Sequence, residues 1–283
     1  MSPKTSSSNL LINCFLPPSP TLRKITHLPT KLPHTTTQYR SRFICLSKKL
    51  SIETHKEEIV IVGGGIAGLS TALALHRLGI RSLVLEQSES LRTGGTSLTL
   101  FKNGWRVLDA LGVGNELRTQ FLEIQGLSIK TNQGKDLRSF DFKDVDPSQE
   151  VRAVERRILL QTLADQLPPD SLQFSSKLAN IEQDDGTQET KLELSNGARL
   201  SAKIVIGCDG IRSPIAKWMG YPEPKYAGHC AFRGLACYPN GQPHEPRVNY
   251  IYGRGVRAGF VPVSSDKVYW FICYNNSNPG LHL

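Results

Sequence analysis

Few folds accommodate four β-branched residues that lead at once into a glycine-rich turn. Ile59–Val62 is such a run, and it predicts a short, fully buried parallel strand. The turn that follows, Gly63–Gly68, has the spacing G-x-G-x-x-G. Apolar residues then recur with a helical period up to Leu78, and Gly79 is suited to end a helix. The segment therefore predicts a strand, a tight turn and a helix.

A second apolar strand follows this helix and ends in an acid. It spans Ser82–Glu86, and Glu86 lies 23 residues after Gly63. Strand, turn, helix, strand and acid in this order are typical of a βαβ unit that binds the ADP half of a dinucleotide. A glycine-rich turn with a purely structural role is the alternative. NAD and FAD share the ADP half, so these residues alone do not separate the two.

Each position in this unit has a physical role in the nucleotide interpretation. Gly63 allows the tight turn, Gly65 lets the backbone approach a pyrophosphate, and Gly68 permits close contact between helix and strand. The N–H groups that open the helix face the phosphate charge, and the acid accepts hydrogen bonds from a ribose diol. The predicted nucleotide-binding residues are Gly63, Gly65, Ile66, Ala67, Gly68 and Glu86.

The positive charge of the chain is concentrated at its N-terminus. The chain of 283 residues has a formal net charge of +9, but residues 1–52 hold eight Lys or Arg and no acid, which leaves a net charge of +1 for the remainder. This distribution argues against a nucleic-acid partner. Residues 1–50 are basic, rich in Ser, Thr and Pro, and acid-free, as in a plastid transit peptide. A disordered basic tail is the alternative.

Several other classes of site are disfavoured by the sequence. Residues 59–75 carry no charge over 17 positions, fewer than the roughly 20 needed to span a bilayer, and glycines interrupt them. The four cysteines after residue 50 show no C-x-x-C spacing, so we expect neither a metal site nor a disulfide framework. No Ser-His-Asp or paired-carboxylate pattern is visible, and we assign no catalytic side chain.

Another strand-to-helix junction lies more than a hundred residues further on. Residues 202–206 predict a buried strand, which leads through Asp209 and Gly210 to a short helix from Pro214 to Trp218. Between the two junctions, Arg156 opens a predicted helix of the form R-x-x-L.

Together these motifs resemble the FAD-dependent aromatic hydroxylases. The features that carry the resemblance are the glycine turn, Glu86, Arg156–Leu159 and the run Gly207–Ser213. Within that family the chain is most similar to the plant monooxygenases related to salicylate hydroxylase and zeaxanthin epoxidase. The resemblance extends from about Glu57 to about Tyr274.

The resemblance implies roles for four further residues. Asp209 and Gly210 would meet the ribityl and pyrophosphate region of FAD and serve the pyridine nucleotide, whereas an ordinary turn with Asp as a helix cap is the alternative. Arg156 would pair with the diphosphate, against the alternative of a solvated helix charge. Arg92 would also contact the cofactor, although arginines are common on protein surfaces.

The expected architecture is α/β, with a Rossmann-like, doubly wound FAD-binding domain on a parallel sheet and a second, mixed β-sheet for the substrate. We assign residues 56–123 and 150–222 to the FAD domain and residues 124–149 and 223–283 to the substrate sheet. Asn196-Gly197 predicts a hairpin turn within the first part. The substrate would lie between the second sheet and the flavin ring.

The implied activity is that of a monooxygenase. NAD(P)H would reduce FAD, and one atom of molecular oxygen would enter an aromatic or alkene small molecule. Members of this family carry a second FAD motif, Gly-Asp-Ala with a later Gly-Gln-Gly run, and these 283 residues contain no Gly-Asp dipeptide. We therefore expect a fold that is incomplete at the C-terminus and an impaired activity. A non-catalytic nucleotide-binding or interaction protein with the same fold is the alternative.

Overall fold

The computed structural model describes residues 55–277 except 93, 95 and 185. The chain divides into two units, Met1–Lys49 and Leu50–Leu283. The predicted transit peptide lies outside the described residues and stays a prediction. No helix in the described part of the chain is long and apolar enough to cross a membrane.

The first sheet has six strands in the order β7-β2-β1-β10-β9-β8. Strands β7, β2, β1 and β10 run parallel, whereas β9 and β8 continue the sheet in antiparallel fashion. The predicted parallel sheet is thus parallel over four strands only, because the turn at Gly197, with φ +86°, reverses the chain between β9 and β10. The strands are β1 (His55–Val62), β2 (Leu83–Leu85), β7 (Leu172–Gln173), β8 (Leu178–Gln183), β9 (Thr190–Leu194) and β10 (Arg199–Gly207).

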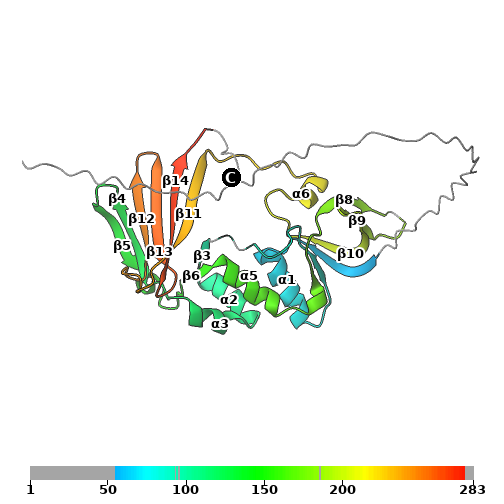
Figure 1. The fold of residues 1–283 in the computed structure, drawn as a ribbon, viewed down its shortest axis with the longest axis horizontal. Helices are drawn as coiled ribbons and strands as arrows, with labels where there is room; N and C mark the ends of the chain where they lie inside the picture. The colour runs from blue at the N-terminus through cyan, green and yellow to red at the C-terminus, as the bar shows by residue number, and fades with distance from the viewer. Residues whose placement is uncertain (1–54, 93, 95, 185, 278–283) are drawn as a thin grey trace, which may run out of the picture. The chain divides into compact units, whose positions relative to one another are not determined.

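Both faces of this sheet are covered (Figure 1). Successive side chains of a strand point to opposite faces, so a strand made only of apolar residues must be buried on both sides. On one face, Ile61 and Val84 pack against Ala72 of α1 (Ile66–Arg77). On the other, Val60 and Val62 belong to a core with the β8–β9 hairpin and with α6 (Pro214–Trp218). The predicted helix from Pro214 to Trp218 is confirmed, with proline in its first turn.

Helices and a small ribbon build the layer beside α1. Helix α5 packs along α1, and the pair lies side by side in Figure 1. The largest hydrophobic core joins this layer to the second sheet, with Trp105, Leu117 and Leu160 fully buried in it. The elements are β3 (Ser97–Leu100), α2 (Lys102–Ala110), α3 (Gly114–Gln120), α4 (Phe142–Val145), β6 (Arg152–Glu155), α5 (Arg156–Asp165) and the 3-10 turn η1 (Pro169–Ser171).

The second sheet also has six strands, in the order β11-β14-β13-β12-β4-β5. Only the β12–β4 pair is parallel, so the sheet is mixed, as predicted. The strands are β4 (Gly126–Thr131), β5 (Asp136–Asp141), β11 (His229–Cys237), β12 (Arg247–Gly253), β13 (Val256–Pro262) and β14 (Lys267–Asn275).

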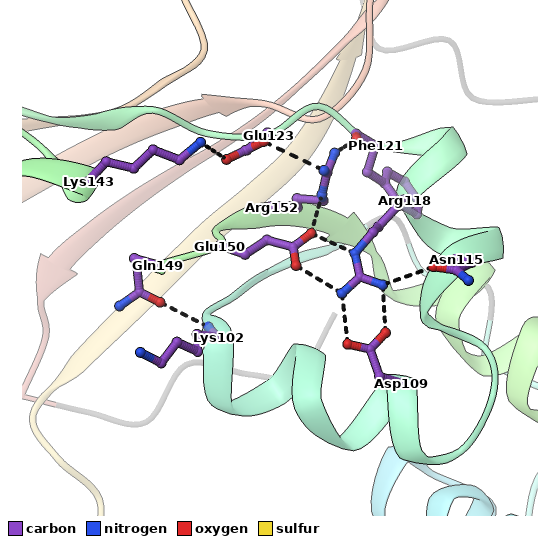
Figure 2. A network of polar contacts seen from close by, with 10 residues as sticks. All are labelled: Lys102, Asp109, Asn115, Arg118, Phe121, Glu123, Lys143, Gln149, Glu150 and Arg152. Carbon is purple, nitrogen blue, oxygen red and sulfur yellow. Dashed lines mark hydrogen bonds and ion pairs between the residues drawn. The ribbon is translucent and has the colours of Figure 1, made fainter. Parts of the chain in front are cut away.

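An arginine on α3 anchors the helical layer (Figure 2). Arg118 pairs with Asp109 on α2 and with Glu150 before β6, and its guanidinium lies 5.0 Å from the centre of the Trp105 ring. These contacts hold the pKa of both carboxyls below their usual range. Arg152 extends the network by pairing with Glu150 as well. The network fixes α2 and α3 against the ribbon from which α5 starts.

Candidate functional site

The glycine turn connects β1 to α1 at the edge where three parallel strands end. The Gly63 N–H donates to the Leu85 carbonyl at the end of β2, at 2.8 Å. The Cys208 N–H, just beyond β10, donates to the Val62 carbonyl at 2.7 Å. The strand order changes direction at β1, because its successor β2 lies on one side and β10 on the other. Open α/β sheets bind ligands at such a switch point.

Two glycines of the turn leave no room for a side chain. Gly63 has φ +110°, and a Cβ there would overlap the carbonyl of Cys208. A Cβ on Gly68 would overlap the Gly63 carbonyl. Gly68 was expected to permit close contact between the helix and a strand. The structure shows such a close approach, but to the Gly63 carbonyl within the turn. The turn is thus compact because these two positions lack side chains.

Gly65 differs from both. Its backbone is extended, with φ −81° and ψ −174°, and a Cβ would meet no atom within 4 Å. Gly65 is also the N-cap of α1, with no capping side chain and no acid in the first turn. The first N–H groups of α1 therefore lack a capping side chain, and the space beside Gly65 is open, which suits a phosphate group. Ile66 and Ala67 form the first turn, where predicted.

Glu86 is held in a fixed orientation directly after β2. It is 7% exposed, and its Oε2 accepts from the Gly64 N–H at 2.7 Å while Oε1 accepts from the Ser88 N–H at 2.9 Å. Each carboxylate oxygen has a second lone pair that can accept from a ribose hydroxyl. The sequence reasoning missed Gly64: a Cβ there would lie 3.0 Å from Oε2 of Glu86. The absence of a side chain at Gly64 therefore leaves room for the Glu86 carboxylate in this position.

Asp209 follows β10 and caps α6. Its carboxylate accepts from the Ser213 hydroxyl at 2.7 Å and from the Ile215 N–H at 3.2 Å. Ser213 is itself the N-cap and accepts from the Ala216 N–H. This geometry is that of the alternative interpretation, a helix cap, and the predicted contact with FAD stays a prediction. Gly210, with φ +82° and open space around it, supplies the turn.

The two predicted arginines lie outside the glycine turn. Arg156 is half-buried at the first position of α5, where its N–H donates to the Thr96 carbonyl. Arg92 is exposed in the segment after Glu86. Within the described residues, no hydrogen bond or ion pair joins either side chain to the turn. The predicted pairing of Arg156 with the diphosphate and the predicted contact of Arg92 with the cofactor therefore stay predictions.

A second candidate region lies on the second sheet. A cavity of about 330 Å³ is lined by residues of β11, β12, β13 and β14. Aromatic rings dominate it: the ring centres of Tyr250 and Phe271 are 5.7 Å apart, and those of Tyr269 and Phe271 6.2 Å. Burial raises the pKa of Tyr269, while the charge of Arg233 opposes that shift. The resemblance predicted strands of a substrate sheet here, Tyr269–Phe271 among them, but the sequence did not place their side chains in a cavity.

Comparison with protein families shows which family the chain belongs to. A family model described as an FAD binding domain matches residues 56–277. The chain belongs to this family. The resemblance to FAD-dependent aromatic hydroxylases that the motifs indicated is confirmed.

Two curated plant proteins are similar over most of the chain. "Monooxygenase 2" of Arabidopsis thaliana is 40% identical over 227 residues, which is 80% of this chain and 55% of that protein. "Monooxygenase 1" of the same organism is 40% identical over 221 residues, or 78% and 55%. The chain thus spans about half the length of these relatives.

Solved structures share the fold. Klebsiella pneumoniae HpxO complexed with FAD and uric acid has a TM-score of 0.69 at 24% identity, covering 81% of this chain and 58% of that one. The p-nitrophenol 4-monooxygenase PnpA of Pseudomonas putida has a TM-score of 0.68 at 21% identity, covering 81% and 60%. The predicted α/β fold with a second sheet is confirmed by this likeness.

Proposed function

We propose that this chain is the FAD-binding part of an NAD(P)H-dependent monooxygenase that acts on a small aromatic or alkene substrate. The observation that carries the proposal is the open space at Gly65, where helix N–H groups face outward beside a fixed acid, Glu86. These residues fit the ADP half of FAD by charge and by shape. Membership of the FAD binding domain family supports the same cofactor.

The described residues would contribute binding and orientation. The first N–H groups of α1 would hold the pyrophosphate, and Glu86 would hold the ribose hydroxyls with the oxygens that Gly64 and Ser88 already orient. Arg156 would add a positive charge near the diphosphate. Bound FAD would supply the chemistry by which electrons from NAD(P)H activate oxygen for transfer to the substrate. The aromatic cavity on the second sheet would position that substrate and exclude water.

We further propose that the protein is imported into the chloroplast. The proposal rests on the acid-free, Ser/Thr/Pro-rich composition of residues 1–50. The domain assignment, with residues 56–123 and 150–222 around the cofactor and residues 124–149 and 223–283 around the substrate, is likewise our proposal. Apart from His55 at the start of β1, the strands of the first sheet lie in the first pair of ranges and those of the second sheet in the second pair, which supports this assignment.

Reconstitution with FAD tests the function. The purified chain is incubated with excess FAD, desalted and scanned for absorbance, and NADPH and NADH are then added in turn. A retained flavin spectrum that bleaches with either nucleotide supports the proposal. Protein that shows no saturable FAD binding in a fluorescence titration would contradict the proposed cofactor, whereas saturable binding without bleaching by either nucleotide would support the non-catalytic alternative.

A further inference from the structure

The helix that carries Arg156 begins at a buried acid. Glu155 ends β6 and occupies the N-cap position of α5, where it is 6% exposed. The first N–H groups of a helix attract an acid at this position, because they form the positive end of the helix dipole. In the part of the chain that the structure describes, however, the Glu155 side chain makes no capping hydrogen bond. A buried carboxylate without a cap requires another partner.

That partner is a lysine of the second sheet. Nζ of Lys267 donates to Oε1 of Glu155 at 2.7 Å. Lys267 opens β14, and its backbone pairs with Cys237 of β11, so the sheet fixes the origin of the lysine side chain. The hydrogen bond to Glu155 raises the pKa of Lys267 above its usual value, although burial acts in the opposite direction. The two side chains therefore form an ion pair at neutral pH.

Burial makes each member of this pair dependent on the other. Lys203 and Glu58 form an ion pair of the same length, 2.7 Å, but both of their side chains are exposed, so water can replace either partner. The Glu155 side chain is only 8% exposed, and the Lys267 side chain is 30% exposed. Removal of the lysine would leave a buried carboxylate without a counter-charge, which favours contact with any other positive group nearby.

The positive groups next to Glu155 are those that the proposed function assigns to the cofactor. Arg156 follows it directly, and within the described residues the half-buried Arg156 side chain makes no hydrogen bond or ion pair. The first turn of α5 holds no acid that would balance the helix dipole. The positive charge at the start of α5 therefore stays unbalanced only while Glu155 is directed at Lys267.

We propose that Lys267 is a positioning residue for the cofactor: it holds the Glu155 carboxylate toward the second sheet and so leaves Arg156 and the N-terminus of α5 to attract the diphosphate of FAD. The inference rests on the proposed function, because that function assigns Arg156 to the diphosphate. It adds that a residue of the sheet assigned to the substrate controls the charge at the cofactor site.

The test is a cycle of two substitutions. Titration calorimetry with FAD and with ADP gives the dissociation constants of the parent chain, Lys267→Met, Glu155→Gln and the double variant. We expect Lys267→Met, which keeps the aliphatic stem, to weaken the binding of both ligands about tenfold, because an uncompensated acid then opposes a doubly charged diphosphate. Glu155→Gln alone should stay within about twofold of the parent. The double variant should regain the parent affinity, since it has no carboxylate to compensate.

A matched control removes a lysine from the exposed ion pair. Lys203→Met should leave the affinity for FAD and ADP unchanged, because Lys203 pairs with Glu58 and not with an acid at the start of α5. Urea unfolding of each variant separates stability from binding. If Lys267→Met does not fold, Lys267→Gln takes its place, because the amide can still donate to the buried carboxylate without carrying a charge.

The outcomes separate this inference from the proposed function. Parent affinity in a folded Lys267→Met or Lys267→Gln variant overturns the inference, since the lysine then contributes to stability alone. Weak binding that the double variant does not restore also overturns it, because Lys267 would then act on the ligand without Glu155. In both cases the parent chain still binds FAD, and the proposed function stands. A parent chain that binds neither FAD nor ADP overturns the proposed function and this inference together.

Discussion

Substitution of Gly65 by valine should separate nucleotide binding from folding. The backbone at Gly65 is already extended, a conformation that valine favours, and a Cβ there meets no atom within 4 Å. The folded state therefore loses only the difference between glycine and an aliphatic residue at a helix N-cap, about 1 kcal/mol or less.

Binding should suffer far more than folding. The valine side chain would occupy the space in front of the first N–H groups of α1, where the pyrophosphate would lie. Loss of two charge-assisted hydrogen bonds at about 1.5 kcal/mol or more each amounts to at least ~3 kcal/mol, a factor above 10² in affinity. ADP and FAD should be affected alike, because they share the pyrophosphate and ribose.

Two measurements on each variant decide the matter: urea unfolding followed by tryptophan fluorescence, and titration with FAD or ADP. Gly79→Ala is the control, because Gly79 ends α1 with φ +75° and open space around it. That change should cost about 1 kcal/mol of stability and leave the affinity unchanged. If Gly65→Val binds FAD and ADP as tightly as the parent chain, the nucleotide assignment of the turn is wrong.

Four further predictions follow from the same structure. Gly63→Ala should destabilise the fold by several kcal/mol in urea unfolding, since φ is +110° and the methyl group would overlap the Cys208 carbonyl. Glu86→Ala should weaken FAD binding by about 1–3 kcal/mol in a fluorescence titration, and unchanged affinity would contradict the ribose role. Arg118→Gln should lower the free energy of unfolding by about 1–2 kcal/mol at neutral pH. Because Arg118 lowers the folded-state pKa of Asp109 and Glu150, its contribution to stability is present above their unfolded-state pKa values and is lost as the pH falls through their folded-state pKa values. Urea unfolding between pH 7 and pH 3 should therefore show a smaller loss of stability on acidification in the variant than in the parent chain. Chloroplast-imported protein should begin near Cys45 to Ser51 by N-terminal sequencing, and retention of Met1 would refute the plastid proposal.

The elements predicted from local sequence signals agree with the structure. The strand at Ile59–Val62, the helix that ends at Gly79 and the short helix begun by Pro214 are each set by residues within a few positions of one another. The spacing of apolar residues, the capping residues and the fixed geometry of proline are local signals that are sufficient to predict such elements. The hairpin turn at Gly197 belongs to the same class.

Features that depend on distant contacts could not be predicted in this way. The role of Gly64 follows from the position of Glu86, 22 residues later. The placement of Arg233 and Arg257 on one face of the sheet, on the two strands beside β14, follows from the strand register, which sequence alternation alone does not give. Likewise, nothing local shows that apolar side chains of β8 and β9 share a hydrophobic core with Val60 and Val62 of β1.

The two candidate regions differ in which atoms make the ligand contacts, and this difference has a consequence for the chemistry. At the glycine turn the groups beside the open space at Gly65 are mainly backbone N–H donors, and the neighbouring positions Gly63 and Gly68 admit no side chain. The cavity on the second sheet is lined by residues of regular strands, where exchange of one side chain leaves the backbone ladder intact. Residues of the cavity can therefore be exchanged one at a time, whereas the backbone geometry of the turn allows little change. Under the proposed function, substitutions in the cavity should alter substrate selectivity, and substitutions in the turn should alter cofactor binding.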